Sequence, residues 1–266
     1  MKTKTIAIVG CGKLAEIVVD ALIKGLLPNY RLVGTMSRTV DKAQYLADKI
    51  NVVQKEYSCL AFDSIDELLA LNANYIVETA SPSALKEFAL RALENGSSII
   101  PLSIGAFADD EFYADVQKTA LENDVKVYIP SGSIGGLDVM RTISLMGEST
   151  AKFTTEKSPN SLLNTKVYDE ALQTEKREVF NGNAKEAIAL FPTKVNVAVA
   201  ASLATVGPEN IDVFIDSLPD YVGDKHCITV ENDEVKAVID IYSSTSNIAG
   251  WSVVNTLRNI ASPIVF

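Results

Sequence analysis

The residues best suited to bind a charged ligand lie near the start of the chain, in the pattern Gly-x-Gly-x-x-Ala. An apolar run ends at Gly10, Gly12 follows, and Ala15 holds the third small position before a run compatible with a helix. Gly10 permits a tight turn, Gly12 lets a pyrophosphate approach the backbone, and Ala15 lets the helix pack closely. The N–H groups and the dipole at the helix start attract phosphates. The pattern predicts a dinucleotide-binding turn flanked by Lys13 and Leu14; a tight turn without a ligand is the alternative.

The end of the second predicted strand, residues 30–36, bears on the choice of dinucleotide. Ser37 and Arg38 follow this strand, and no acidic residue stands there. An acid at this place binds the ribose 2′-hydroxyl of NAD, whereas an arginine accommodates the 2′-phosphate of NADP. Arg38 can pair with that phosphate and stack on the adenine. The sequence favours NADP, or the use of both cofactors, over strict NAD; the alternative is an ordinary solvated arginine.

Small residues follow three further predicted strands, at 75–80, 98–103 and 126–130. Ligands of open parallel sheets bind at the carboxyl ends of the strands, so we expect the nicotinamide and its ribose to lie across these ends. Each segment taken alone is explained as well by a turn, and the interpretation depends on their joint placement. The residues expected at the cofactor are Ala80, Ser81, Ser103, Ala106 and Ser133.

Three polar side chains in the second half of the chain are candidates for chemistry on a substrate. His226 is the sole histidine, is expected to start a strand at the rim of a pocket, and has the near-neutral pKa of a general base or proton shuttle. Asn196 lies on a nearly apolar helix, residues 195–204, where a buried amide needs a partner. Lys157 is suited to hold a substrate carboxylate. The alternatives are an incidental histidine, a helix-packing amide and a solvated lysine.

The order of the predicted elements indicates an α/β protein with a Rossmann parallel-sheet domain and a second α+β domain. Strands alternate with helices up to residue 130, which is typical of βαβ units. Later strands follow one another without helices between them, at 211–217, 227–231 and 235–242. We expect a dinucleotide-binding domain over 1–134, an α+β domain over 135–246, and a C-terminal helix within 247–266 that packs back on the first domain.

Two local stretches complete the prediction. Ser64 and Glu67 have the spacing of a capping box, in which each side chain binds the backbone N–H of the other residue at the start of a helix. The polar stretch 161–176 has weak periodicity, and no element is assigned to it.

The composition excludes several classes of protein. The 266 residues are 47% hydrophobic and carry a net charge of −10, which disfavours a nucleic-acid partner. We find no apolar run of membrane-spanning length and no secretory signal. The three scattered cysteines form no disulfide framework, which indicates a reducing cytoplasm. With a single histidine and no ligand-rich spacing, we expect no metal site.

Several stretches of the chain resemble the L-aspartate dehydrogenase family. They are residues 78–82 and 103–109 in the first half, and 131–138, 179–187 and 191–198 in the second, with His226 downstream. The most specific of these stretches is 191–198, which starts with Phe-Pro and contains Asn196. The resemblance implies a Rossmann domain, an α+β domain for substrate binding and dimerisation, and a homodimer. It also implies that His226 matches the catalytic histidine, Asn196 the cofactor-contacting asparagine, and Ser133 the position of a cofactor-contacting alanine.

The activity implied by the resemblance is the NAD(P)-dependent conversion of L-aspartate and water to oxaloacetate and ammonium through an imino acid. Hydride passes between the substrate Cα and the nicotinamide, and His226 activates the water or shuttles protons. Lys157, Asn196 and His226 would contact this small dicarboxylate substrate.

The chain departs from the family pattern in two places. Residues 246–251 replace a motif like Asn-Pro-Lys-Thr-Ser, and a basic pair before a double proline is reduced to a single lysine in 156–159. Two other functions therefore stay open: an NADP(H)-dependent reductase of a different small carboxylated carbonyl or imine, and a non-catalytic nicotinamide-binding sensor.

Overall fold

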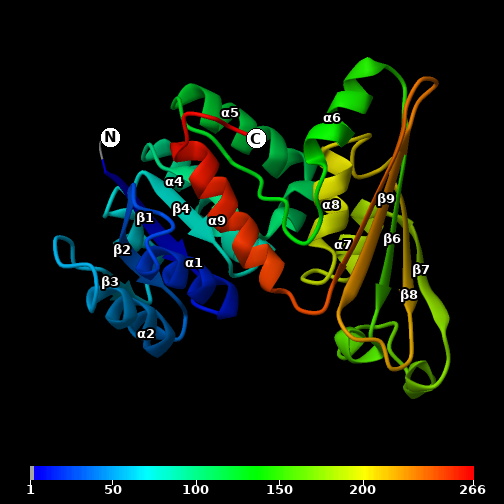
Figure 1. Ribbon diagram of the computed structural model, residues 1–266, viewed down its shortest axis with the longest axis horizontal. Coiled ribbons are helices and arrows are strands. Elements are labelled where there is room, and N and C mark those ends of the chain that lie inside the picture. The colour runs from blue at the N-terminus through cyan, green and yellow to red at the C-terminus, as the bar shows by residue number, and fades with distance from the viewer. Residues whose placement is uncertain (1–2) are drawn as a thin grey trace. The chain divides into compact units, whose positions relative to one another are not determined.

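The computed structural model describes residues 3–266, which fold as two compact units (Figure 1). The first unit comprises the chain up to residue 106, residues 110–130 and residues 249–266; the second comprises residues 107–109 and 131–248. The chain therefore returns to the first unit for its last helix. Within residues 3–266, no helix combines the length and the apolar character needed to cross a bilayer.

The first unit is built on a parallel sheet of five strands in the order β3-β2-β1-β4-β5. The strand order reverses between β1 and β4, which is where such sheets bind ligands. A 3-10 turn follows β5 at Ile104–Ala108. The other elements are β1 (Lys4–Val9), α1 (Lys13–Ile23), β2 (Tyr30–Met36), α2 (Val40–Asn51), β3 (Leu60–Phe62), α3 (Ile65–Leu69), β4 (Tyr75–Glu78), α4 (Pro82–Glu94), β5 (Ser98–Pro101), α5 (Asp110–Glu122) and α9 (Asn247–Ala261).

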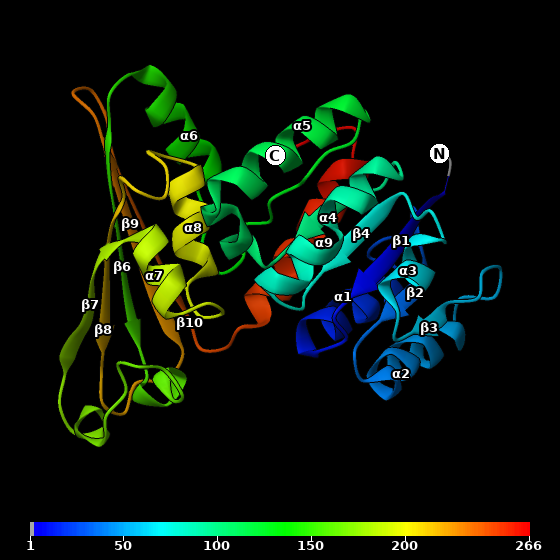
Figure 2. The ribbon, with the colours of Figure 1, turned by 180° about the vertical axis from the view of Figure 1, so that it is seen from behind.

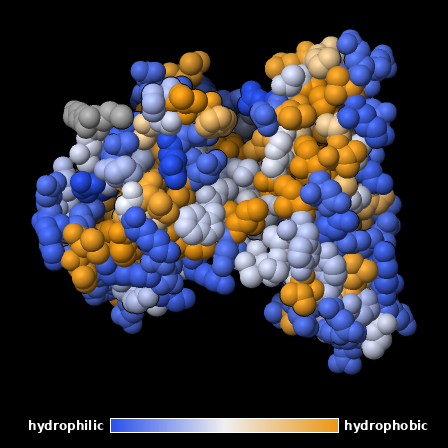
Figure 3. All heavy atoms as spheres, in the orientation of Figure 1, coloured by the Kyte–Doolittle hydropathy of each residue, from blue (hydrophilic) through white to orange (hydrophobic). Residues whose placement is uncertain are grey.

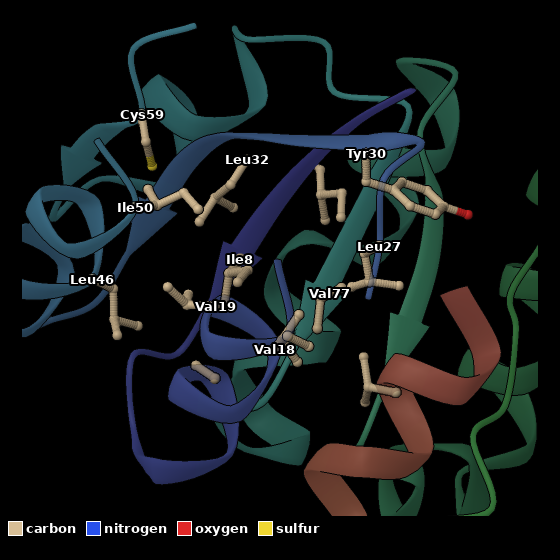
Figure 4. Packing of buried hydrophobic residues seen from close by; sticks show 14 of the residues in the cluster. Ile8, Val18, Val19, Leu27, Tyr30, Leu32, Leu46, Ile50, Cys59 and Val77 are labelled. Carbon is tan, nitrogen blue, oxygen red and sulfur yellow. The ribbon is translucent and has the colours of Figure 1, made fainter. Parts of the chain in front are cut away.

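The main core of the first unit lies between one face of this sheet and helices α1, α2 and α9 (Figure 4). In α1, Ala15, Val18 and Val19 recur at helical spacing and form one buried face. They meet alternate residues of the strands, which point to the same side of the sheet. α4 packs against β5, and α5 packs against α4 (Figure 2).

The second unit is a mixed sheet in the order β10-β9-β6-β8-β7, in which β6 and β8 are parallel and the other neighbours antiparallel. One face is covered by helices, with α6 against β9, α7 against β8 and α8 against β6 (Figure 2). The elements are α6 (Leu137–Met146), β6 (Thr150–Lys157), β7 (Arg177–Asn183), α7 (Ala184–Leu190), α8 (Asn196–Leu203), β8 (Asp212–Ser217), β9 (Asp224–Glu231) and β10 (Lys236–Ser243).

Strand β6 shows how this sheet separates its two faces. Ala151, Phe153, Thr155 and Lys157 alternate along the strand and are all buried. The opposite face carries exposed charged residues on several strands, and the right-hand margin of this unit is mainly hydrophilic in Figure 3. Two polar side chains, those of Thr155 and Lys157, therefore lie on the face that a purely structural sheet would fill with apolar ones.

The structure confirms the predicted α/β architecture, a parallel Rossmann-type sheet followed by an α+β unit. The strand predicted at 126–130 is wrong. Only Val127 pairs with the sheet, in a single bridge to Ile99, where Ile99 N donates to Lys126 O (2.9 Å) and Tyr128 N donates to Ile99 O (2.8 Å). Pro130 has no N–H with which to extend the ladder.

The capping box predicted at Ser64 is also wrong, because the Ser64 side chain makes no cap hydrogen bond to the short helix α3. A complete capping box instead starts α7, where Glu186 N donates to Asn183 Oδ1 (2.9 Å) and Asn183 N donates to Glu186 Oε2 (3.0 Å). The unassigned stretch 161–176 contains parts of two 3-10 turns, at Pro159–Leu162 and Glu170–Gln173. Leu162 and Leu172 are buried and anchor it.

Candidate active site

A cavity of about 300 Å³ opens at the carboxyl ends of β1, β2 and β4 in the first unit. Ligands of open parallel sheets bind at this edge. The lining brings together several residues that the sequence predicts at the cofactor: Gly10, Gly12, Ser37, Arg38, Ala80 and Ser81. Lys13 and Leu14 occupy the first turn of α1, Lys13 exposed and Leu14 half-buried.

The two glycines of the turn differ in their surroundings, and this tests whether a dinucleotide fits. Gly10 has a φ of +91°, and a Cβ there would lie 2.7 Å from Ala80 N. A Cβ on Gly12 would meet no atom within 4 Å. Helix α1 starts directly after Gly12, with no side chain capping its first N–H groups. Open space in front of uncapped N–H groups suits a pyrophosphate, so the residues present fit the cofactor.

The same cavity carries two exposed cations, Arg38 and Lys42. The sequence predicted Arg38 but not Lys42, which is the third residue of α2. Glu87 on α4 brings one exposed carboxylate to the cavity. The β2 end of the site is thus suited to an anionic group.

The ends of β4 and β5 are joined by a buried carboxylate that the sequence analysis did not single out as a site residue. Glu78 is 0% exposed, and its Oε1 accepts hydrogen bonds from Ala80 N (2.6 Å) and Ser103 Oγ (2.8 Å). Its Oε2 accepts one from Ser103 N (3.0 Å). Burial raises the pKa of Glu78, and these hydrogen bonds oppose that rise. Ser103 and Ala106, both predicted at the cofactor, are buried, and the Ser103 hydroxyl is engaged by Glu78.

In the second unit, His226 lies within β9 on the helix-covered face of the sheet. It is 2% exposed and is the third residue of the strand, so it does not start the strand as predicted. Its Nδ1 is 2.9 Å from Thr155 Oγ1, its cross-strand neighbour on β6, and its Nε2 is 3.1 Å from Ser133 Oγ. The ring stacks on Phe153 with centroids 5.6 Å apart. Both ring nitrogens are therefore held by hydroxyl groups.

The electrostatic surroundings keep this imidazole neutral. Burial lowers the pKa of His226 to about 4, the charge of Lys157 lowers it too, and Asp224 acts in the opposite direction. At neutral pH the ring is uncharged and can accept a proton, which a general base must do. The low pKa makes it a weak base in this state of the protein.

Lys157 is buried, so the alternative of a solvated lysine is wrong. It is 5% exposed, and its Nζ pairs with Asp224 Oδ1 at 2.9 Å across the β6–β9 ladder. It stands two residues from Thr155, on the same face. Ser217 faces it from β8, and the Ser217 Oγ is buried without a hydrogen-bond partner among residues 3–266. Two cross-strand rows thus place polar groups side by side: Thr155 with His226, and Lys157 with Asp224 and Ser217.

Asn196 is the first residue of α8 and is half-buried, at the start of the helix predicted over 195–204. The loop that carries Ser133 reaches this helix end, since a Cβ on Gly132 would lie 3.5 Å from Val197 Cγ1. The second unit therefore brings Ser133 and His226 together, with Asn196 at the helix end that this loop approaches.

Sequence reasoning missed four residues of these clusters: Glu78, Thr155, Ser217 and Asp224. The first ends an apolar strand, and a charged residue there was a usable signal. The other three become neighbours of His226 or Lys157 only through strand register, which no local pattern encodes. Residues 3–266 contain no cluster of three or more His, Cys, Asp or Glu side chains that could hold a metal ion.

Two family models match the chain. Residues 138–260 match the C-terminal model of aspartate dehydrogenase, and residues 10–130 match the NAD-binding domain of homoserine dehydrogenase. Among curated relatives, L-aspartate dehydrogenases of Methanococcus maripaludis strain C5 and Methanosarcina barkeri strain Fusaro are each 31% identical to this chain. In both comparisons 97% of each protein is covered.

A solved structure agrees with these relatives. The aspartate dehydrogenase of Thermotoga maritima superposes with a TM-score of 0.75 at 28% identity, covering 99% of each chain. Scyllo-inositol dehydrogenase of Lactobacillus casei, at 9% identity and a TM-score of 0.62, shares the fold alone. The resemblance found in the sequence is confirmed: this chain belongs to the L-aspartate dehydrogenase family.

Proposed function

We propose that this protein is an NAD(P)-dependent L-aspartate dehydrogenase. It converts L-aspartate, NAD(P)⁺ and water to oxaloacetate, ammonium and NAD(P)H through an imino acid. The single observation that carries the proposal is the buried, neutral His226, whose two ring nitrogens are held by Ser133 and Thr155. The relatives named above carry this activity in their names, and the first unit has a turn that fits the dinucleotide.

The first unit holds the cofactor, which supplies the hydride chemistry. The N–H groups at the start of α1 would hold the pyrophosphate next to Gly12, with Lys13 and Leu14 as neighbouring contacts. Arg38 and Lys42 receive the 2′-phosphate, so NADP is preferred to NAD. Ala80, Ser81, Ser103 and Ala106 at the strand ends would hold the nicotinamide half, and Ser133 and Asn196 are the further contacts that the family resemblance implies.

The second unit holds the substrate and moves its protons. His226 Nε2 takes a proton, by way of Ser133 Oγ, from the water that adds to the imine carbon, while Thr155 fixes Nδ1. Lys157 binds a substrate carboxylate. Asp224 already pairs with the Lys157 side chain, so a substrate carboxylate has to compete with Asp224 for the Lys157 Nζ.

We further propose a homodimer located in the cytoplasm. All three cysteines are unpaired, two of them buried, which fits a reducing compartment. Sedimentation analysis of the purified protein at several concentrations tests the dimer; a single monomeric species would contradict it.

The test of the activity is consumption of reduced cofactor, followed by absorbance. We expect NADPH to be consumed with oxaloacetate and ammonium together and with neither alone, and NADH to be consumed more slowly. Consumption with another keto acid only would change the substrate. Tight NADPH binding without turnover of any of them would favour a sensor.

The variant His226→Ala tests the assigned role. Turnover should fall by about 10² or more, the usual range for a lost general acid–base group. The dissociation constant for NADPH should stay within about threefold, because His226 is assigned to proton transfer and is not among the residues assigned to the cofactor. Equal losses of both would remove the catalytic assignment.

A further inference from the structure

Glu78 is a buried carboxylate without a cationic partner. It ends β4, is 0% exposed, and no Lys, Arg or His among residues 3–266 forms an ion pair with it. An isolated buried charge is costly to a fold unless hydrogen bonds or a function compensate. An apolar residue would fill this strand end at lower cost, so the carboxylate calls for an explanation.

The hydrogen bonds of Glu78 oppose the effect of burial, which raises its pKa, and provide for the ionised form. Backbone N–H groups, which only donate, point at both of its oxygens: Ala80 N at Oε1 and Ser103 N at Oε2. The Ser103 hydroxyl, free to rotate, adds a third donor to Oε1 at 2.8 Å. A carboxylate accepts at both oxygens, and for the protonated acid only the Ser103 hydroxyl could accept the added hydrogen. The donor set therefore matches the negatively charged form.

The position of Glu78 relative to the cofactor follows from the sheet. The anion-binding residues Arg38 and Lys42 lie at the end of β2, and the pyrophosphate turn follows β1. Because the strand order is β2-β1-β4-β5, a dinucleotide that starts at β2 and crosses β1 continues over β4 and β5. Its nicotinamide half then lies over the two strand ends that Glu78 joins. Residues Thr79–Ser81, directly after Glu78, already line the cavity.

The charge of this half of the cofactor depends on its redox state, because the oxidised nicotinamide ring is a cation and the reduced ring is neutral. We propose that Glu78 stabilises the bound oxidised cofactor over the reduced one by direct charge attraction, and so favours hydride transfer from NAD(P)H to the substrate. The proposal rests on the proposed function in taking NAD(P) as the cofactor and, for the direction of the reaction, the amino acid as the reduced product. The equilibrium between the bound reactants and products would therefore be shifted toward the amino acid.

The test is the ratio of the dissociation constants for NADP⁺ and NADPH, measured by calorimetry without any substrate. In Glu78→Gln we expect NADP⁺ to bind on the order of tenfold more weakly relative to NADPH. The variant removes the attraction between the carboxylate and the positive ring, which is stronger inside a protein than in water. Glu87→Gln is the matched control: it removes an exposed carboxylate that lines the same cavity, and solvent screening should leave the ratio within about twofold.

An unchanged ratio in a folded Glu78→Gln protein would overturn the proposal, and so would an equal change in the Glu87→Gln control. If Glu78→Gln does not fold, infrared difference spectra of the wild type on exchange of NADPH for NADP⁺ decide the matter. A band of protonated Glu78 in the NADP⁺ complex would contradict the proposal. A carboxylate band that shifts on exchange of NADPH for NADP⁺ would support the proposal. Because no arm contains aspartate, failure of the proposed activity would be seen separately, in the turnover assay.

Discussion

At the scale of single residues, the depressed pKa of His226 makes the stability of the protein depend on pH. The folded state holds this ring neutral down to about pH 4, whereas an unfolded histidine titrates near 6.5. Between these values the unfolded chain binds a proton that the folded chain does not, so stability rises with pH across this window. Acidification through it should remove about 3 kcal/mol. Urea unfolding of wild type and His226→Gln at pH 7.5, 5.5 and 4 measures this.

The difference between the two proteins isolates the histidine, because carboxylates titrate in both. Wild type should lose stability relative to His226→Gln as the pH falls through the window, and the difference should level off below pH 4. Parallel curves would mean that the buried ring is not held neutral.

Lys157 and Asp224 should move the pKa of His226 in opposite directions. Lys157 lowers it and Asp224 raises it. Lys157→Met should therefore raise the pKa, and Asp224→Asn should lower it further. The chain has one histidine, so NMR titration of labelled histidine follows a single ring. Lys225→Gln is the control: Lys225 is adjacent in sequence but pairs with Asp240 at 3.3 Å, away from the imidazole.

Shifts of the same sign in Lys157→Met and Asp224→Asn would show that repacking, and not charge, sets the pKa of His226. A shift of similar size in Lys225→Gln would show the same.

At the scale of elements, the strand–turn–helix from β1 to α1 separates folding from cofactor binding. Gly12→Ala should leave the free energy of unfolding within about 0.5 kcal/mol, because its φ of −93° suits alanine and its Cβ meets open space. It should weaken NADP⁺ binding by about tenfold or more, since the methyl group occupies the approach of the pyrophosphate.

Gly10→Ala should instead lower the free energy of unfolding by about 2–3 kcal/mol or more. Gly10 has a positive φ, and the added Cβ would lie 2.7 Å from Ala80 N. Urea unfolding and calorimetric titration of both variants check the pair. Strong destabilisation by Gly12→Ala, or unchanged NADP⁺ binding, would contradict this account of the turn.

Element prediction succeeded where the signal was local and failed where it was not. The helix predicted over 195–204 was visible as an apolar run in the sequence, and the structure has it at Asn196–Leu203. The strand at 126–130 failed because pairing with a neighbour, and not propensity, decides whether a short apolar run becomes a strand. Ser64 and Asn183 have the same capping spacing, and only the fold decided which one is used.

At the scale of the whole molecule, the first unit depends on the last segment of the chain. Val253 and Leu257 of α9 are 0% exposed, and Tyr30 Oη donates to Leu257 O at 2.7 Å. Each buried aliphatic side chain contributes about 1.5–3 kcal/mol. With Val254 as a third, the sum approaches the whole net stability of a domain, about 5–15 kcal/mol. A chain ending at residue 248 should therefore lose cooperative unfolding of the first unit and NADP⁺ binding.

Circular dichroism during thermal unfolding and calorimetric titration with NADP⁺ check this truncation. A chain ending at Ser262 is the control, because Ile264, Val265 and Phe266 are exposed. If the chain ending at residue 248 binds NADP⁺ as wild type does, α9 is not part of the folded first unit.

The sequence by itself determined the features that a few adjacent residues encode. The Gly10–Gly12 turn, the alternation of strands and helices, the absence of an acid after β2, and the family stretches around Ser133 and Asn196 can all be identified without a structure. Each depends on residue types at a fixed, short spacing, and such a pattern can be identified in the sequence before the chain is folded.

Only the tertiary structure decided which side chains meet. His226 and Thr155 are 71 positions apart, His226 and Ser133 93, Lys157 and Asp224 67, and Glu78 and Ser103 25. Strand register sets two of these pairs, His226 with Thr155 and Lys157 with Asp224, since a shift of one residue turns every side chain to the other face. The burial that lowers the pKa of His226 is likewise a property of the packed sheet and its helices, which no stretch of sequence contains.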